Sequence, residues 1–514
     1  MMRKITDKLC SSVLIGVLMV FLTSACAKKD RLPDPKIMAG MAKISGKITN
    51  FQQKPGEKQA IINLYVNNVI TVDDSKFHTI ISEDGSFQFE FPIECSPTLV
   101  TINTPMFGSK YVFIPVTSSE VTKVEITCEE KGKEMSVTMS DSLNFTTKDL
   151  LNSWNMIANF YYSVDNVSLY DLKPEDFSHM VLDSMLPNRI SRSMDISILS
   201  ECAKTFVTKE CRFVFLVGIL LNYNEYIDMN YRNFGPQNEN QIFCRQPTNR
   251  SYFQLLKQFD LNSPQNLYHG LYAMVFQRLL KNDFLKIPPI KDTPIDEWLK
   301  VVKPNLKDLI GFDSGLFYDM LVANAYSRQF SINHIPLSKI QKENVKDYFN
   351  NTGISDVLIR KSDEIAKQND DISFLKTVVN PTPAVPKKAL LNSIVSKYKG
   401  KVVLIDFWAT WCGPCMDAMN DIKDIKKQMK GKDLVFVYIT SVSSPKKIWE
   451  EKVPIIRGEH YYLTQEEWEY IMESFGFSGI PTYLLYNSKG ELKNQVTGYP
   501  GNDAMKVMID KILL

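Results

Sequence analysis

Two cysteines, Cys412 and Cys415, lie where a predicted buried strand meets a predicted helix, and few folds accommodate that arrangement. The apolar run 401–408 (KVVLIDFW) has the length and the β-branched content of a buried strand. After a short turn, Cys-Gly-Pro-Cys opens a helix that we expect to end near residue 429, and the run 434–440 (LVFVYIT) predicts the next buried strand. A β-α-β unit with C-x-x-C at the start of its helix predicts an α/β domain with a redox-active cysteine pair.

The start of a helix is chemically suited to a reactive cysteine. Its first turn offers N–H groups without partners in the helix and the positive end of the helix dipole, and both stabilise a thiolate. The thiolate, rather than the thiol, attacks a disulfide. We therefore expect Cys412 to be the exposed attacking residue and Cys415 to be the shielded residue that resolves the mixed disulfide. Pro414 suits the first turn of a helix, where its missing N–H costs little.

A zinc site is the alternative interpretation of a C-x-x-C pair. Structural zinc takes four ligands, most often from cysteine and histidine. The C-terminal part of the sequence has no second C-x-x-C, and His460 is its only histidine. We therefore expect no metal at this pair, and neither a metal nor an organic cofactor in the reaction.

The stretch VVLIDFWATWCGPC, residues 402–415, resembles the thioredoxin superfamily, and more closely its TlpA/ResA-like branch of bacterial envelope thiol–disulfide oxidoreductases. A second motif, Gly-Ile-Pro-Thr at 479–482, precedes an apolar strand, as it does in that family. The resemblance covers about residues 380–514 and implies a thioredoxin fold there. It also implies that Pro481 is cis and faces the cysteine pair, and that the backbone of Ile480 pairs with an extended client segment.

The same resemblance assigns further roles. Asp406 matches the buried carboxylate of thioredoxin that assists proton transfer to the resolving cysteine. In thioredoxin the neighbouring strand supplies a lysine partner, whereas this chain has Tyr438 there, so we expect Asp406 to lack that partner. For Trp408 we expect a packing role. The candidate catalytic residues are Cys412, Cys415, Asp406 and Pro481. The candidate substrate-binding residues are Trp411, Gly413, Pro414 and Ile480.

The first residues of the chain predict export. A basic start precedes an apolar run, residues 9–22, which ends in small residues. That run is too short to span a membrane, which needs about 20 residues. The small residues before Cys26 resemble a bacterial lipobox, although Thr23 stands where that pattern usually has leucine. Cleavage after Ala27 and an uncleaved anchor are the alternatives. We expect a signal peptide at 1–25, a lipidated cysteine after it, and a place in the cell envelope, lipid-anchored in the periplasm.

The pattern of polar and apolar residues changes twice after the export segment. Residues 26–42 are charged and contain prolines, which predicts a tether. Over 43–135, short runs alternate apolar and polar residues, and Asp84-Gly85 is a hairpin signal. This texture predicts an all-β, sandwich-like domain.

The middle of the chain has helical spacing over 136–378, which predicts an all-α domain. Within it, Ser338 and Gln341 have the spacing of a helix capping box. Prolines at alternating positions over 380–386 indicate a linker. We expect the α/β thioredoxin-like domain at 379–514, which makes the protein multidomain.

The sequence leaves open whether the remaining cysteines form disulfides. Cys10 and Cys26 lie in the export segment and two more cysteines form the redox pair. The remaining ones are Cys95, Cys128, Cys202, Cys211 and Cys244. Export makes disulfides possible, and Cys95 with Cys128 is a candidate bridge, but buried free thiols are the alternative for each.

These observations predict an exported, membrane-anchored enzyme that reduces protein disulfides. The near balance of 60 basic and 58 acidic residues gives no reason to expect a nucleic-acid partner. The expected partners are disulfide-containing envelope proteins, with apocytochrome c among the candidates, a membrane thiol-electron donor, and the membrane through the lipid anchor. A disulfide oxidase or isomerase is one alternative. A binding or sensor lipoprotein with a redox-switch domain is another.

Overall fold

The computed structural model describes residues 31–52, 59–129, 134–236, 243–351 and 353–513. The predicted signal peptide at 1–25 and Cys26 lie outside these residues. The chain forms two compact units, an N-terminal unit of Met1–Arg328 with Leu337–Arg360, and a C-terminal unit of Gln329–Pro336 with Lys361–Leu514. Among the described residues, no helix combines the length and the apolar character that a membrane span requires.

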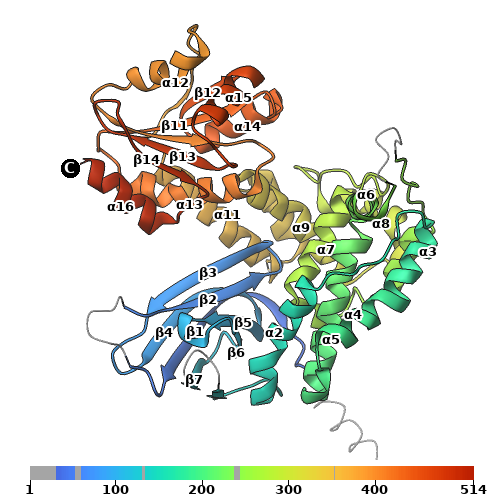
Figure 1. Cartoon of the computed structure of the whole chain (residues 1–514). Coiled ribbons are helices and arrows are strands. Elements are labelled where there is room, and N and C mark those ends of the chain that lie inside the picture. The colour runs from blue at the N-terminus through green and yellow to red at the C-terminus, as the bar shows by residue number, and fades with distance from the viewer. Residues whose placement is uncertain (1–30, 53–58, 130–133, 237–242, 352, 514) are drawn as a thin grey trace, which may run out of the picture. The chain divides into compact units, whose positions relative to one another are not determined.

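The N-terminal unit begins with two four-stranded sheets (Figure 1), in the orders β4-β1-β7-β8 and β3-β2-β5-β6. Their strands are β1 Lys36–Ile48, β2 Ile61–Asn68, β3 Asp73–Ile80, β4 Ser86–Ser96, β5 Thr98–Asn103, β6 Val112–Val116, β7 Val121–Cys128 and β8 Met135–Met139. Along β7 every second side chain is buried, including Val124 and Ile126, because successive side chains point to opposite faces. The predicted all-β, sandwich-like fold is confirmed.

Several details of this region differ from the sequence prediction. The predicted tether is wrong from Lys36 onward, because β1 pairs with β4 there, with Ala42 opposite Phe91. The predicted hairpin at Asp84-Gly85 is also wrong: the turn exists, with Gly85 at φ 84°, but β3 pairs with β2 while β4 pairs with β1. Alternation within a strand does not reveal its partner. Strand β8 also extends beyond residue 135, where the sequence predicts the β domain to end.

The candidate bridge between Cys95 and Cys128 is absent, since the two cysteines form no disulfide. Both are buried. The thiol of Cys128 donates to the backbone oxygen of Met106 at 3.4 Å. The buried-thiol alternative therefore holds for this pair.

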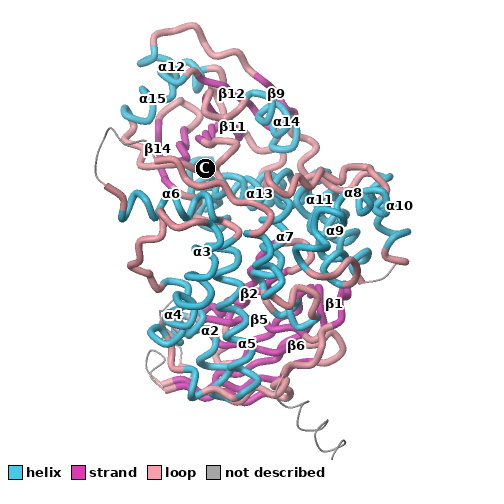
Figure 2. The backbone as a smooth tube through the Cα atoms, turned by 90° about the vertical axis from the view of Figure 1, so that its right-hand side faces the viewer, coloured by secondary structure: helices cyan, strands magenta, loops and turns pink. Residues whose placement is uncertain are grey.

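Most of the elements that follow the two sheets up to residue 371 are helices, as Figure 2 shows by colour. They are α2 Thr147–Tyr162, α3 Pro174–His179, α4 Leu186–Ser193, α5 Glu201–Phe215, α6 Tyr223–Phe234, α7 Gly270–Lys281, α8 Ile295–Ile310, α9 Leu316–Asn333, α10 Lys339–Tyr348 and α11 Ile354–Asp371, with shorter turns η1 Pro105–Phe107, η3 Met180–Met185, η4 Ile196–Ile198, η5 Leu216–Leu220, η6 Tyr252–Gln258 and η7 Pro264–Tyr268. Helix α2 packs on β6 and β8. Ser327 on α9 donates to the carbonyl of Ile70 at 2.6 Å. These contacts join the predicted β and helical domains into one unit. The capping box of Ser338 and Gln341 is confirmed.

The C-terminal unit is built on a six-stranded sheet in the order β14-β13-β10-β11-β12-β9. The strands are β9 Thr377–Val379, β10 Val402–Phe407, β11 Leu434–Ser441, β12 Gly458–Leu463, β13 Thr482–Tyr486 and β14 Leu492–Thr497; the helices are α12 Lys387–Ser396, α13 Gly413–Gln428, α14 Lys446–Ile456, α15 Gln465–Ser474 and α16 Asn502–Leu513. The strands β10, β11, β12 and β9 run parallel to one another. Strand β13 pairs antiparallel with β10, and β14 pairs antiparallel with β13. The α/β fold and the predicted strand–helix–strand unit around Cys412 are confirmed.

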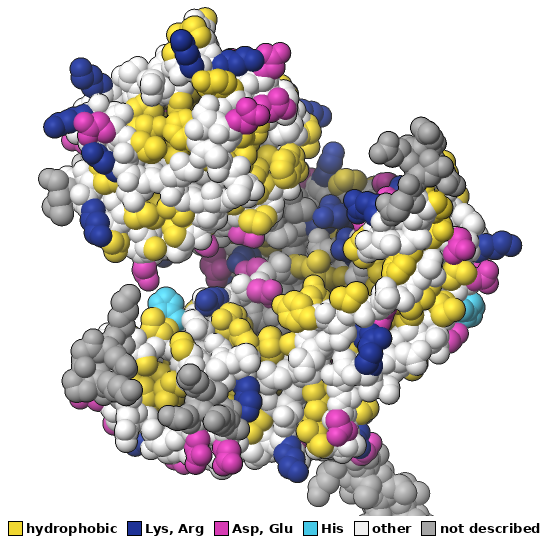
Figure 3. All heavy atoms as spheres, viewed as in Figure 1, with side chains coloured by type: hydrophobic (Ala, Val, Ile, Leu, Met, Phe, Trp, Pro, Cys, Tyr) yellow, Lys and Arg dark blue, Asp and Glu magenta, His cyan; other side chains and the backbone are white. Residues whose placement is uncertain are grey.

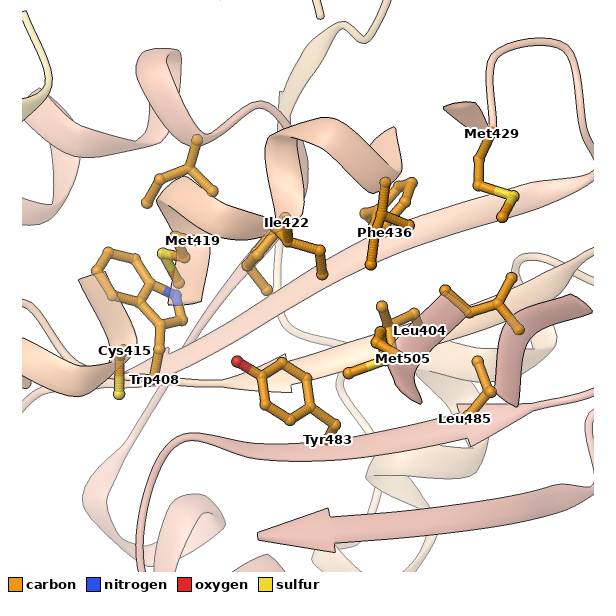
Figure 4. Packing of buried hydrophobic residues seen from close by; sticks show 14 of the residues in the cluster. Leu404, Trp408, Cys415, Met419, Ile422, Met429, Phe436, Tyr483, Leu485 and Met505 are labelled. Atoms are coloured by element: carbon orange, nitrogen blue, oxygen red, sulfur yellow. The ribbon is translucent and has the colours of Figure 1, made fainter. Parts of the chain in front are cut away.

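Apolar side chains cover both faces of this sheet, which explains why the central strand β10 is buried at every position. On one face, Figure 4 shows Met419 and Ile422 of α13 above Leu404 and Phe436 of the strands, with Met505 of α16 beside them. Helices α12 and α15 cover the other face. The packed sheet gives the start of α13 a rigid support.

Candidate active site

The cysteine pair lies at the N-terminus of α13. Cys412 is the N-cap of this helix, and its Sγ accepts a hydrogen bond from the backbone N–H of Cys415 at 3.2 Å. Gly413 and Pro414 form the first turn. The two cysteines form a disulfide, with their Cα atoms 5.3 Å apart. The sulfur of Cys412 thus lies where helix N–H groups and the helix dipole stabilise negative charge.

The expected exposure of Cys412 is wrong for the disulfide form. Its side chain is only 5% exposed, although Cys415 is still more deeply buried at 0%. The sulfur of Cys412 lies against the backbone carbonyl of Ile480 at 3.8 Å, and that contact shields it. Trp411 is 65% exposed next to the pair, whereas Trp408 is fully buried, so the packing role expected for Trp408 is confirmed.

The proline loop also lies where the resemblance implies. The Ile480–Pro481 peptide bond is cis, and the Ile480 carbonyl faces Cys412 Sγ. Strand β13 begins immediately afterwards at Thr482, whose hydroxyl donates to the Gly479 carbonyl at 2.6 Å. The carbonyl of Pro481 accepts from the N–H of Gly498 at 2.8 Å. These bonds hold the proline loop beside the disulfide.

Asp406 lies on β10 inside the core and is 2% exposed. It lies opposite Tyr438 on β11 and Tyr483 on β13. Among the described residues, neither carboxylate oxygen has a hydrogen-bond partner. Burial raises the pKa of Asp406 to about 8, and the positive charge of Lys426 lowers it in part. The carboxyl group is therefore mostly protonated at neutral pH but titrates close to it.

The prediction that Asp406 lacks the lysine of the neighbouring strand is confirmed, because Tyr438 lies opposite it. Lys426 of α13 supplies a cation from the helix instead. Lys426 is 1% exposed, its Nζ lies 4.7 Å from the centre of the Tyr438 ring, and it donates to the carbonyl of Ile456 at 2.5 Å. Burial lowers the pKa of Lys426 to about 7. Its spacing from the buried Met419 and Ile422 places it on the apolar stripe of α13, which is the signal that could have identified it.

His460 completes this buried group. It is 0% exposed, and its ring stacks on Tyr438 at 5.2 Å. Among the described residues neither ring nitrogen has a hydrogen-bond partner. Burial, with a smaller contribution from Lys426, lowers the pKa of His460 to about 3, so the imidazole is neutral at physiological pH.

Comparisons with known proteins point to the same part of the chain. Residues 387–508 match the Redoxin family model. Thiol-disulfide oxidoreductase ResA of Geobacillus kaustophilus is 31% identical over 107 residues, which are 20% of this chain and 59% of that protein. An uncharacterized protein of Haemophilus influenzae is 32% identical over 124 residues, which are 23% of this chain and 77% of that protein. The chain thus spans less than two thirds of the Geobacillus relative.

A solved structure gives a further comparison. The thioredoxin domain of a thiol-disulfide oxidoreductase from Bacteroides vulgatus is 19% identical, with coverage of 23% of this chain and 84% of that one, and a TM-score of 0.21. The family match lies within the unit that carries the cysteine pair and the proline loop. Through residues 387–508, the chain belongs to the Redoxin family of thioredoxin-fold proteins.

Proposed function

We propose that this protein catalyses thiol–disulfide exchange with Cys412 and Cys415 as its redox pair, and that it reduces disulfides of other proteins. The observation that carries the proposal is the disulfide between these residues at the N-terminus of α13, against the Ile480–Pro481 segment. The relatives named thiol-disulfide oxidoreductase ResA support the same chemistry.

The reaction begins with the reduced pair. The thiolate of Cys412 attacks one sulfur of the client disulfide, a mixed disulfide forms, and the other client sulfur leaves as a thiolate that takes up a proton. The thiol of Cys415 then gives up its proton and attacks Cys412 Sγ. The Cys412–Cys415 disulfide forms, the mixed disulfide breaks, and the second client sulfur leaves and is protonated. Two electrons have passed from the pair to the client.

In this proposal Asp406 accepts the proton of Cys415. A general base works best when its pKa lies near the working pH, and the pKa of about 8 meets that condition. Complete burial of both residues supports a direct role for the carboxyl group, because bulk water is kept away from the resolving thiol.

Client binding involves the rim of the pair. The exposed indole of Trp411 offers an apolar contact, and the backbone of Ile480 beside Pro481 offers pairing groups for an extended client segment. Gly413 and Pro414 lie in the same first turn and leave room for a client chain.

The proposal extends to location and partners. The export signal at 1–25 and Cys26 support lipid anchoring in the cell envelope, with the catalytic unit in the periplasm. The clients are then disulfide-containing envelope proteins, such as apocytochrome c. In an oxidising compartment the pair needs a membrane thiol-electron donor to return it to the dithiol form. Incorporation of labelled palmitate that is lost in Cys26→Ala tests the anchor.

Reduction of insulin disulfides by the full chain, with dithiothreitol as the electron source, tests the activity. We expect Cys412→Ser to abolish turnover above the dithiothreitol background. Cys244→Ser is the matched control, because Cys244 is an exposed cysteine of the N-terminal unit, and it should retain full activity. Equal turnover in the wild type and in Cys412→Ser would contradict the proposal.

A further inference from the structure

The N-terminal unit contains a cavity of about 440 Å³ that the redox chemistry does not use. It lies among α4, α6, α7 and the turn η5, and we call it the η5 cavity. Its apolar lining includes Val217, Met229, Leu271 and Met274. A volume of this size accommodates a small organic molecule.

The turn that forms one wall of the η5 cavity has an unusual backbone. Residues Leu216–Leu220 form a π-helical turn directly after α5. Such turns are rare and occur frequently at functional sites. Gly218 lies in the middle of this turn, and a Cβ atom placed on it would meet no atom within 4 Å. The glycine therefore leaves the cavity open where almost any other side chain would project into space.

Several polar side chains on the lining are already hydrogen-bonded within the protein. Asp165 accepts hydrogen bonds from Arg189 and Arg192, each at 2.8 Å. Asn230 accepts from the N–H of Leu169 at 2.8 Å and donates to the carbonyl of Val167 at 2.9 Å. These hydrogen bonds hold the wall of the cavity in place, so we do not assign ligand binding to these side chains.

Arg278 of α7 is different. Its Nε atom is shielded from solvent and has no hydrogen-bond partner among the described residues. Arg278 also lines a second, smaller cavity of about 200 Å³ together with Lys281. The charges of Arg328 and Arg278, added to burial, lower the pKa of Lys281, so the three cations lie close together. An unpaired guanidinium group on a cavity wall is a binding group for an anion.

We propose that the η5 cavity binds a small amphipathic monocarboxylate, with its apolar body in the cavity and its carboxylate on Arg278. The two terminal NH₂ groups of a guanidinium offer parallel donors that match the two oxygens of a carboxylate. Lys281 and Arg328 add positive potential at the same end. The apolar walls accept a hydrocarbon body and exclude water from it.

A free acid fits this lining better than a peptide. Each peptide group carried into the cavity would need hydrogen-bond partners, or it would lose several kcal/mol of solvation. The polar side chains Asp165 and Asn230 are already committed. A hydrocarbon chain with a terminal carboxylate makes no such demand. This inference is independent of the redox pair and concerns a unit that does not contain it.

Isothermal titration of sodium decanoate into the full chain tests the proposal. We expect saturable binding with one site per chain and at least tenfold weaker binding of decanol, which has the same chain length without the charge. We expect Gly218→Leu, which places a side chain in the cavity, and Arg278→Met, which removes the guanidinium, each to weaken decanoate binding at least tenfold. Lys300→Met, which removes an exposed cation from α8, is the matched control and should bind as the wild type does.

A second variant that narrows the cavity distinguishes loss of ligand binding from loss of folding. Met274 is 36% exposed, so Met274→Trp should tolerate the larger side chain and narrow the η5 cavity from α7. Figure 3 shows that apolar side chains are exposed over the helical part of the N-terminal unit. Met274→Trp should weaken decanoate binding at an unchanged melting temperature. The proposal is overturned if decanoate does not bind saturably, if decanol or a short peptide with a C-terminal leucine binds as tightly as decanoate, or if the folded variants bind like the wild type.

Discussion

Lys426 and Asp406 are buried titratable groups of one core, and each shifts the pKa of the other. The positive charge of Lys426 lowers the carboxyl pKa that burial has raised, and the negative charge of Asp406 raises the ammonium pKa that burial has lowered. The helix that begins at the cysteine pair therefore also carries the cation that tunes the carboxyl group.

Removal of that cation should move the pH dependence of the reaction. In Lys426→Met the pKa of Asp406 should rise above about 8, because the only cation that lowers it is lost. If Asp406 acts as the ionised base, single-turnover resolution of the mixed disulfide should reach half of its maximal rate at a higher pH than in the wild type. Lys427→Met removes an exposed lysine of α13 and is the control, which should leave the profile in place.

Asp406→Asn should stabilise the protein near neutral pH. Burial raises the folded-state pKa from 3.8 to about 8, so between these values the folded state keeps a proton that the unfolded state has lost. The carboxyl group therefore makes stability fall as pH rises, by roughly 1.4 kcal/mol for each pH unit. Because the amide does not titrate, the gain in free energy of unfolding should grow from pH 5 to pH 7. Urea titrations at both values measure it. A gain that is absent or shrinks with pH would contradict the assigned pKa.

The two cysteines should fail in different ways. Cys415→Ser keeps the attacking thiolate but cannot resolve the intermediate, so it should accumulate a mixed disulfide with an oxidised client. Cys412→Ser should accumulate none, because the attacking sulfur is gone. Non-reducing electrophoresis with mass spectrometry of the adduct distinguishes the variants. An adduct formed through Cys415 in Cys412→Ser would reverse the assigned roles.

Trp411 should affect protein clients more than small disulfides. Its side chain is 65% exposed, so Trp411→Ala should change the free energy of unfolding by less than about 0.5 kcal/mol. Loss of the rim contact should lower kcat/KM for insulin by about threefold to tenfold and leave reduction of an aromatic small-molecule disulfide unchanged. Tyr470→Ala, which removes another exposed aromatic ring of the same unit, should have no such effect. Equal losses for both disulfides would assign Trp411 a role in the chemistry itself.

Local sequence signals predicted much of the C-terminal unit. The apolar run that became β10 and the Cys-Gly-Pro-Cys turn that starts α13 need no distant partner to be recognised. Tyr438 was also correctly placed opposite Asp406. These features depend on hydrophobic runs and on the residues that start a helix, and both can be recognised from residues that are neighbours in the sequence.

Features that depend on contacts between distant parts of the chain could not be predicted from the sequence. Strand β12 has a burial pattern without clear alternation and exists because β11 and β9 flank it. The inward position of Lys426 was hidden because lysine on a helix is usually solvent-exposed, and only the surrounding apolar stripe indicates otherwise. The η5 cavity arises from packing between several helices, and no single segment encodes it.

The reduction potential of the Cys412–Cys415 couple in the full chain tests the proposed direction of the reaction. It is measured by equilibration with thiol–disulfide buffers and trapping of free thiols. The account predicts a value near the roughly −270 mV of thioredoxin, which allows the pair to reduce envelope disulfides. A value near the roughly −120 mV of a strong oxidant would contradict it and assign the pair to disulfide formation.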